Sequence, residues 1–499
     1  MSNEVRKVVV VGADATAWLA AAAVKKAFLH RSIEVLVLVP EKHRPSLLGL
    51  WTLPSLRGLH SMVGIRESDV LRRTGATFRL GSEHLHWQGN GSHSLHAHGD
   101  IGTSLKGIPF YKYLLMQALA GRPERLSDYS LAATAAQMGR FARPMSTNAL
   151  TSSFTYGFHI DPSAHTALAR EHATKLGVGS AMGDVVGIER TEDGRISCLI
   201  SQQGERIAGD LFLDCSGPTG ALMDRISDEP REDWSAWLIN DRILCATAPA
   251  ANDPPAITRT IAGSMGWSWQ IPLANSTVVG HVYRSDFAND TQVAERLRSA
   301  TGCDEPVVIS LAQGRRRANW VGNCIAIGEA AVELEPLAGA ALHVAELGIA
   351  MLIELFPLDT TSRLEAIEYN RIMGEHADAL RDFTIAHYRA GAPREEEYWR
   401  ATRTHTAPER FNNRMDLFHA SGRLQMLDNE SFEETDWAWL LLGAHCLPES
   451  LELHVRANLA GVTPDAFESL RSSIQRLVAS MPRHAEYLRH QMNAATPRT

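Results

Sequence analysis

Residues 7–12 read KVVVVG, a run of four valines that ends in a glycine. An apolar run of this kind predicts a buried strand of a parallel sheet, because such strands are covered on both faces. The alanine-rich segment 15–28 follows and predicts a helix, and IEVLVLV at 33–39 predicts a second strand. This strand–helix–strand order is typical of an α/β fold and opens many dinucleotide-binding proteins.

The composition is that of an ordinary globular protein. The chain has 499 residues, of which 44% are hydrophobic, and 57 acidic against 49 basic residues give a formal net charge of -8. Because long blocks of like charge are missing, binding to nucleic acid through a basic surface is disfavoured. The six cysteines lack paired spacing, so we expect buried, reduced thiols in a cytoplasmic protein. The N-terminal apolar stretch is too short and too interrupted for a membrane span, and we expect no membrane partner.

Further along the chain, the patterns predict more sheets and then helices. Segment 184–217 alternates apolar and polar residues and contains turn signals at Asp193-Gly194 and Gln203-Gly204. It predicts antiparallel strands that lead into a buried strand at 210–214. Another strand is expected within 323–331, and from about Leu342 the pattern is mostly helical. We therefore expect a large domain over residues 1–350 with mixed sheets, and a mostly helical domain over 351–499.

Several motifs in this order resemble one family. They are GATFRLG at 75–81, YGFHID at 156–161, GDLFLDCSG at 209–217, GWSWQIPL at 266–273, IGEAAVELEPL at 327–337 and DWAWLLLG at 436–443. Together with the opening they resemble the flavin-dependent tryptophan halogenases over nearly the whole chain. The element GWSWQIP is specific to that family, whereas a glycine turn after a first strand occurs in many dinucleotide-binding proteins. The resemblance implies an α/β fold with a three-layer, Rossmann-like FAD-binding domain of the flavin monooxygenase type and a mostly helical C-terminal region.

The resemblance also implies a cofactor, partners and a set of binding residues. In the family, FAD reduced by a separate flavin reductase generates an oxidant from oxygen and halide. This oxidant passes through a tunnel to a lysine beside an indole or another aromatic substrate, and homodimers are common. The residues that the resemblance places around FAD are Gly12, Ala13, Ala15, Gly49, Thr52, Gly328, Glu329, Pro336 and Leu337.

The two tryptophans of GWSWQIP are expected to form a wall. Trp267 and Trp269 are two positions apart, so on a strand their rings lie on the same face. With Ile271 and Pro272 they are predicted to line the tunnel and to exclude water and bulky substrates. The alternative is that the two rings only fill the core.

The sequence departs from the family at positions that carry chemistry. Arg79 stands where the family has its lysine, and it is the one candidate for contact with oxidant or substrate. A guanidinium has no free amine to react with the oxidant. Ala338 replaces the family glutamate that accepts the ring proton or positions the oxidant, and Asp14 stands at the second glycine of the nucleotide turn. A carboxylate there repels a pyrophosphate, so weakened FAD binding is expected.

These departures leave two functions open. The chain is either a flavin-dependent oxidoreductase that halogenates or hydroxylates an indole or another aromatic group, or a halogenase-fold binding or partner protein that has lost catalysis. Lysine-dependent halogenation is disfavoured under both hypotheses, because Arg79 and Ala338 cannot replace the missing groups.

Further histidines and tryptophans suggest other sites. His84 and His86 form an HxH pair, followed by His93, His96 and His98, and HxH on a strand puts two imidazoles on one face. We expect no metal site, because glycines interrupt the segment and the family counterpart holds no metal. Three tryptophans near the end of the chain are expected either to stack on an aromatic ligand or to fill the core. They are Trp399, Trp437 and Trp439.

Overall fold

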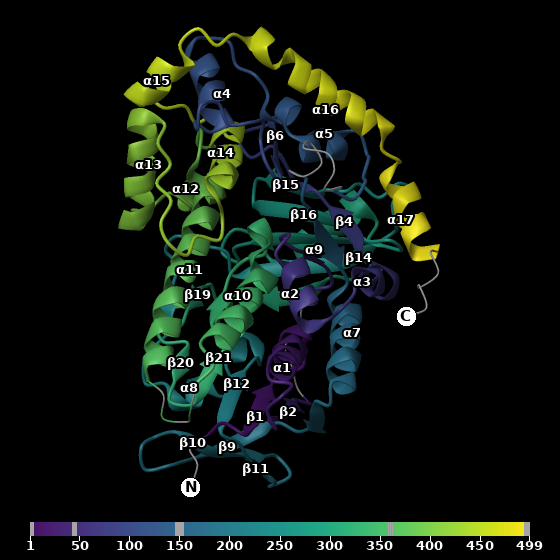
Figure 1. Ribbon diagram of the computed structural model, residues 1–499, viewed down its shortest axis with the longest axis vertical. Helices are drawn as coiled ribbons and strands as arrows, with labels where there is room; N and C mark the ends of the chain where they lie inside the picture. Colours follow the sequence, from purple (N-terminus) through teal and green to yellow (C-terminus); the bar gives the residue numbers. More distant parts are fainter. Residues whose placement is uncertain are drawn as a thin grey trace.

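The computed structural model describes residues 4–41, 47–144, 154–357, 359, 361 and 363–493. Two large sheets form its centre (Figure 1). The six-stranded sheet lies toward the end of the molecule that carries the N-terminus, and the seven-stranded sheet lies in the middle. The C-terminal helices run along one side and over the opposite end.

The six-stranded sheet is built around the predicted opening. β1 (Lys7–Val11) leads into α1 (Ala15–Ala27), and β2 (Glu34–Val39) returns parallel to β1, as the sequence predicts. On the other side β1 pairs in parallel with β12 (Leu211–Asp214), which pairs with β21 (Cys324–Ala326). The four valines of β1 are at most 1% exposed, as expected for a strand that is covered on both faces. The order is β20-β21-β12-β1-β2-β8, with β8 at Gly179–Met182 and β20 at Trp320–Val321.

The predicted antiparallel meander is confirmed. β9 (Val185–Arg190), β10 (Ile196–Ser201) and β11 (Arg206–Ala208) pair in sequence and lead into β12. Gly194 and Gly204 stand at the two turns with φ of 83° and 79°, a conformation that favours glycine.

The second large sheet has the order β18-β14-β17-β16-β15-β5-β6. Its neighbours are antiparallel except β15 and β5, which run parallel. A smaller sheet, β3-β7-β4, pairs Leu50–Trp51, Gly157–Ile160 and Thr77–Arg79. The strands of the large sheet are β5 (Gly81–Leu85), β6 (His93–Ala97), β14 (Arg242–Ala248), β15 (Thr258–Gly263), β16 (Gly266–Pro272), β17 (Thr277–Tyr283) and β18 (Val307–Ser310).

The C-terminal part is helical, as expected from the sequence. Its helices are α10 (Ala340–Glu354), α11 (Leu364–Arg389), α12 (Glu397–Ala401), α13 (Glu409–Ser421), α14 (Glu434–Gly443), α15 (Leu453–Leu459), α16 (Glu468–Ser480) and α17 (His484–Asn493). Position 350, where we place the domain boundary, lies inside α10. Leu337–Glu354 is long and apolar enough to cross a membrane, but 61% of it is buried within the protein, as in a core helix. The predicted α/β fold with mixed sheets and a helical C-terminal region is confirmed.

The tryptophans of β16 lie in the middle of the second sheet. Trp267 and Trp269 are 0% and 1% exposed, and their ring centres are 5.7 Å apart on one face, as the alternation predicts. Gly280 of β17 lies opposite Trp269, and a Cβ atom at Gly280 would come within 2.1 Å of the Trp269 ring. The large ring therefore depends on a residue without a side chain on the neighbouring strand.

This contact gives a stability prediction. Gly280→Ala should lower the free energy of unfolding by about 1–3 kcal/mol, because the added methyl group forces Trp269 or the strand to move. Urea unfolding followed by circular dichroism measures the change. Gly263→Ala on β15 is the matched control, since its Cβ would meet its nearest neighbour at 3.6 Å. Equal losses in both variants would contradict the argument.

Candidate functional site

The carboxyl ends of β1 and β21 bring together the first group of predicted flavin residues. At Gly12 a Cβ atom would lie 2.5 Å from the carbonyl oxygen of Cys215, so only glycine fits between β1 and β12. Gly328, with φ of 70°, approaches the start of α1, where its Cβ would lie 3.1 Å from the Thr16 side chain. Ala13, Ala15 and Glu329 belong to the same two turns. The structure thus assembles the scaffold of a nucleotide site.

The N-terminus of α1 carries its own anion. Asp14 is the N-cap residue, and its Oδ1 accepts hydrogen bonds from the backbone N–H groups of Thr16 and Ala17 at 3.0 and 3.4 Å. In dinucleotide-binding folds these N–H groups face the pyrophosphate, which the helix dipole attracts. In this chain a carboxylate already occupies that position, and its charge repels a second anion.

The second group of predicted flavin residues is packed against the sheets. Gly49 lies on Val278, where a Cβ would come within 2.9 Å of the valine side chain. Thr52 exchanges hydrogen bonds with the backbone of Phe158, since its N–H donates to the carbonyl and its hydroxyl accepts from the N–H, both at 2.9 Å. Both residues therefore serve the packing of this loop.

Trp51 fills the space between this loop and the turn at Pro336 and Leu337. It is 3% exposed, and its ring centre lies 5.8 Å from that of Trp269. Gly339 follows the turn, and a Cβ at Gly339 would lie 3.2 Å from Cδ1 of Trp51. An indole thus occupies the region between this loop and the turn that precedes Gly339.

The predicted tunnel residues all lie in the core. Trp267, Trp269 and Ile271 share one face of β16, and Ile271 is 0% exposed. Pro272 ends the strand, and its carbonyl accepts a hydrogen bond from the Thr77 hydroxyl at 2.6 Å. With Trp51 and Trp87 the two tryptophans form a row of rings, because Trp267 lies 5.8 Å from Trp87.

Arg79 is buried and held by hydrogen bonds within the protein. Only 2% of it is exposed, and Nε donates to the Thr258 hydroxyl at 2.9 Å. Nη1 donates to the Thr52 carbonyl at 2.9 Å and to Nε2 of His98 at 2.6 Å. Nη2 donates to the Ser82 hydroxyl at 2.8 Å. Burial lowers the pKa of Arg79 to about 9, which still leaves the group charged at pH 7. Its donors therefore point at acceptors of the core.

The histidines beside Arg79 are kept neutral. Burial, and then the positive charge of Arg79, lower the pKa of His98 and of His159 well below the usual 6.5. A neutral His98 can accept the proton that Arg79 donates to its Nε2. This arrangement is stable only while His98 carries no second proton.

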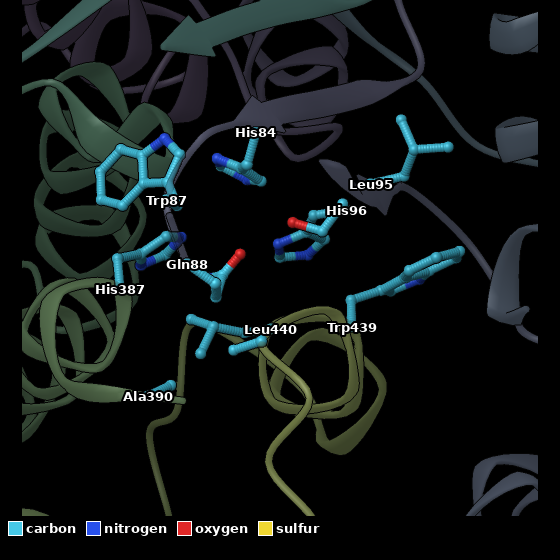
Figure 2. Close-up of a pocket in the computed structure, with 11 residues that line it drawn as sticks. His84, Trp87, Gln88, Leu95, His96, His387, Ala390, Trp439 and Leu440 are labelled. Carbon is cyan, nitrogen blue, oxygen red and sulfur yellow. The ribbon is translucent and has the colours of Figure 1, made fainter. Parts of the chain in front are cut away.

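A cavity lies between the β5–β6 edge of the sheet and the C-terminal helices (Figure 2). It has a volume of about 20 Å³, room for a water molecule or an ion rather than for an indole. Trp439 lines it, whereas Trp437 packs on Phe383 with ring centres 5.1 Å apart. The lining includes His84, Trp87, Gln88, His96, His387 and Leu440.

Similarity to known proteins now gives this geometry a family. The family model described as Tryptophan halogenase matches residues 7–458. The chain belongs to this family. Among solved structures it resembles BrvH, a flavin-dependent halogenase from Brevundimonas sp. BAL3, with a TM-score of 0.92, 31% identity and coverage of 98% of this chain and 100% of that one. A flavin-dependent halogenase from Xanthomonas campestris matches with a TM-score of 0.92, 30% identity and coverage of 99% and 100%. Tryptophan 7-halogenase KtzQ of Kutzneria sp. (strain 744) is 25% identical over 98% of both chains.

Tryptophan halogenases of this kind use FAD that a separate flavin reductase reduces, which confirms the predicted cofactor at the level of the family. In this member the residues do not fit a tightly bound FAD. Asp14 takes the hydrogen bonds that a pyrophosphate needs, and Trp51 occupies the space between the loop and the turn. Weakened binding of FAD therefore remains our expectation for this chain.

One buried polar group escaped the sequence analysis. Glu335, directly before the predicted Pro336, is 0% exposed and accepts hydrogen bonds from Asn240, Gln313 and Tyr388. Tyr388 in turn accepts the Trp267 Nε1 proton at 2.8 Å. Burial raises the pKa of Glu335. Its place among the apolar residues of VELEPLAGAAL was the available signal, since a carboxylate there needs partners.

The buried histidines predict acid sensitivity. Groups with pKa lowered in the folded state bind protons only after unfolding, so stability should fall as the pH drops below about 6.5. Each fully buried neutral histidine should contribute a loss of about 1.4 kcal/mol per pH unit below that value. Urea midpoints at pH 7.5 and 5.5 measure the slope, and His98→Gln, which keeps an acceptor for Arg79, should have a shallower one. Equal slopes in the two proteins would contradict a neutral, buried His98.

Proposed function

We propose that this chain is a non-halogenating member of the tryptophan halogenase family, a binding or partner protein in which flavin binding is weak and the lysine relay is lost. Of the two hypotheses left open by the sequence, this is the one that the geometry supports better. The observation that carries it is the environment of Arg79, because the resemblance places the family lysine at this position.

The guanidinium of Arg79 is committed to the core. Its hydrogen bonds to Thr258, Thr52, His98 and Ser82 use all three nitrogens. A group that relays an oxidant must present an atom to a reacting molecule, and breaking these bonds would leave a buried charge without partners, which is costly. Arg79 therefore serves the packing of the sheets rather than chemistry.

The turn at Ala338 supports the same proposal. Ala338 replaces the family glutamate and brings neither a proton acceptor nor a donor to this position. Its φ of 64° lies in the left-handed region, where a non-glycine residue is strained, and Gly339 continues the turn with φ of 75°. The turn therefore presents no carboxylate at position 338.

Hydroxylation of an aromatic ligand is the other activity that the sequence allows, and it depends on FAD binding. It requires FAD at the start of α1, where Asp14 repels the pyrophosphate. A binding or partner role needs only the scaffold. The proposal includes a cytoplasmic location and a homodimer. Size-exclusion chromatography with light scattering tests the homodimer.

The direct test combines binding and activity. The purified chain, titrated with oxidised FAD, should show no saturation in the micromolar range, and with a flavin reductase, NADH, bromide or chloride, tryptophan and simple indoles it should yield no halogenated product. Mass spectrometry detects the product. A halogenated indole formed over many turnovers by the unmodified chain would overturn the proposal, and a hydroxylated one would support the oxidoreductase hypothesis instead.

Asp14 offers a sharper test of the flavin argument. Asp14→Gly should tighten FAD binding at least about tenfold, or ~1.4 kcal/mol, because it removes a like charge and opens the backbone to the pyrophosphate. The lost N-cap should cost only a few tenths of a kcal/mol when glycine replaces it. Asp14→Asn is the matched control, since it removes the charge and keeps the cap, and it should give a smaller gain. Unchanged affinity in both variants would show that Asp14 does not limit FAD binding.

The lost relay can be tested in the same background. Adding Arg79→Lys and Ala338→Glu to Asp14→Gly should raise halogenation of indoles above the level of the single variant, measured at equal flavin occupancy. If the triple variant binds FAD and gains no activity, these two positions are not the active centre.

A further inference from the structure

Three histidines from distant parts of the chain meet at the cavity. His84 lies on β5, His96 on β6 and His387 on α11. One ring nitrogen of each lies within 4.8 Å of the other two, and Figure 2 shows the three rings around one space. Nothing in the proposed function uses this cluster.

The sheet brings the rings of His84 and His96 together. A turn places His86, which the sequence pattern pairs with His84, away from them. His84 pairs with Ser94, and Ser82 pairs with His96, so His84 and His96 are diagonal neighbours on one face. His86 lies beyond the end of β5 with φ of 64°, and its Nδ1 accepts a hydrogen bond from the Gly91 N–H. The HxH pair of the sequence is therefore broken, and a different pair is formed.

Hydrogen bonds to oxygen acceptors fix the tautomers of His387 and His96. His387 Nδ1 faces the Phe383 carbonyl at 2.9 Å and His96 Nε2 faces the Asp436 carboxylate at 2.8 Å, and both nitrogens must donate because these oxygens only accept. A donated proton on one nitrogen leaves a lone pair on the other. The lone pairs are at Nε2 of His387 and at Nδ1 of His96.

His84 follows the same rule. Its Nδ1 lies 2.7 Å from the Thr260 hydroxyl, which itself accepts from Trp87 Nε1 and donates toward the Glu83 carbonyl. In the tautomer in which the hydroxyl proton goes to the Glu83 carbonyl, the His84 Nδ1 donates to the hydroxyl and Nε2 holds the lone pair that an ion requires. Each imidazole thus has a fixed outer partner, the arrangement found for histidines that ligate metals.

The wall of the cavity offers one more polar atom beside the three rings. Gln88 also lines the cavity, and its Oε1 is buried without a hydrogen-bond partner among the described residues. A buried acceptor without a donor indicates a missing partner, such as a metal ion or the water bound to it.

We propose that His84, His96 and His387 bind one Zn²⁺ ion, with Gln88 facing its fourth position. Three imidazole nitrogens suit zinc, whereas Ca²⁺ and Mg²⁺ require oxygen ligands. Zinc–nitrogen bonds of 2.0–2.1 Å place tetrahedral ligands roughly 3.3 Å apart, so the rings close in slightly around the ion. The cavity of about 20 Å³ holds the ion and leaves the fourth position for Gln88 or a water molecule.

The first test uses the full chain without flavin or halide, so its result is independent of the proposed function. After chelator treatment and buffer exchange, calorimetric titration with ZnCl₂ should give one ion per chain. Co²⁺ in place of Zn²⁺ should give the visible absorption of a four-coordinate site, and X-ray absorption of the zinc form should show imidazole nitrogens. Sulfur ligands in that spectrum, or no binding below about 100 μM, would overturn the proposal.

Variants then locate the ion. His96→Gln and His387→Gln should each weaken the affinity for zinc at least about 100-fold. The loss of an outer-shell partner alone costs up to that factor, and each of these variants removes a ligand. His93→Gln is the matched control, because His93 lies on the same strand as His96, is exposed and pairs with Glu83. Zinc affinity unchanged in both cluster variants, or lost equally in the control, would overturn the assignment. If a cluster variant fails to fold, the cobalt and X-ray absorption spectra of the unmodified chain decide.

Discussion

A positive charge buried between two sheets is the constraint on which much of this structure depends. Arg79 ends β4, and its hydrogen bonds reach Thr258 at the start of β15, Ser82 on β5 and Thr52 just after β3. None of these direct partners is a carboxylate. A charge removed from water in this way is tolerated only if every donor finds an acceptor, so the relative position of the sheets is tied to one side chain. The sequence resemblance places the reactive lysine of the family at this position, and in this chain the side chain there is part of the core.

Around the predicted nucleotide site, too, the residues serve the packing of the protein. At Gly12 and Gly328 neighbouring atoms approach the backbone so closely that the strands and α1 require glycine there whether or not a flavin binds. Asp14 satisfies the start of α1 internally, and Trp51 packs against Trp269 and Gly339. Scaffold residues are retained by folding alone, whereas residues that served only a ligand are free to change. This difference explains why a chain can match its family over residues 7–458 and still differ at positions that carry its chemistry.

The histidine cluster shows the opposite pattern. At Arg79 the polar atoms are directed at partners inside the protein, but at His84, His96 and His387 one nitrogen of each ring has a hydrogen-bond partner and the three rings line a cavity. Gln88 adds an acceptor without a donor. A buried acceptor without a donor, beside three ring nitrogens around one space, indicates where a ligand completes the structure. The region between the sheet edge and the C-terminal helices is therefore the part of this protein that still has the character of a site.

The sequence by itself determined the fold and its family. Valines in a run, alternation in the meander and the glycine turns are local patterns, and local patterns suffice where hydrophobic burial and backbone conformation decide the outcome. It also determined which chemical groups are lost, because Arg79, Ala338 and Asp14 are visible as residue types. Only the tertiary structure decided what their replacements do and where a new site arises. His387 lies about three hundred positions from His84, and no spacing rule connects a helix to a sheet edge that far away. The tautomers of the rings, and so the direction of their lone pairs, depend on partners such as Thr260 and Asp436 that only folding brings into contact.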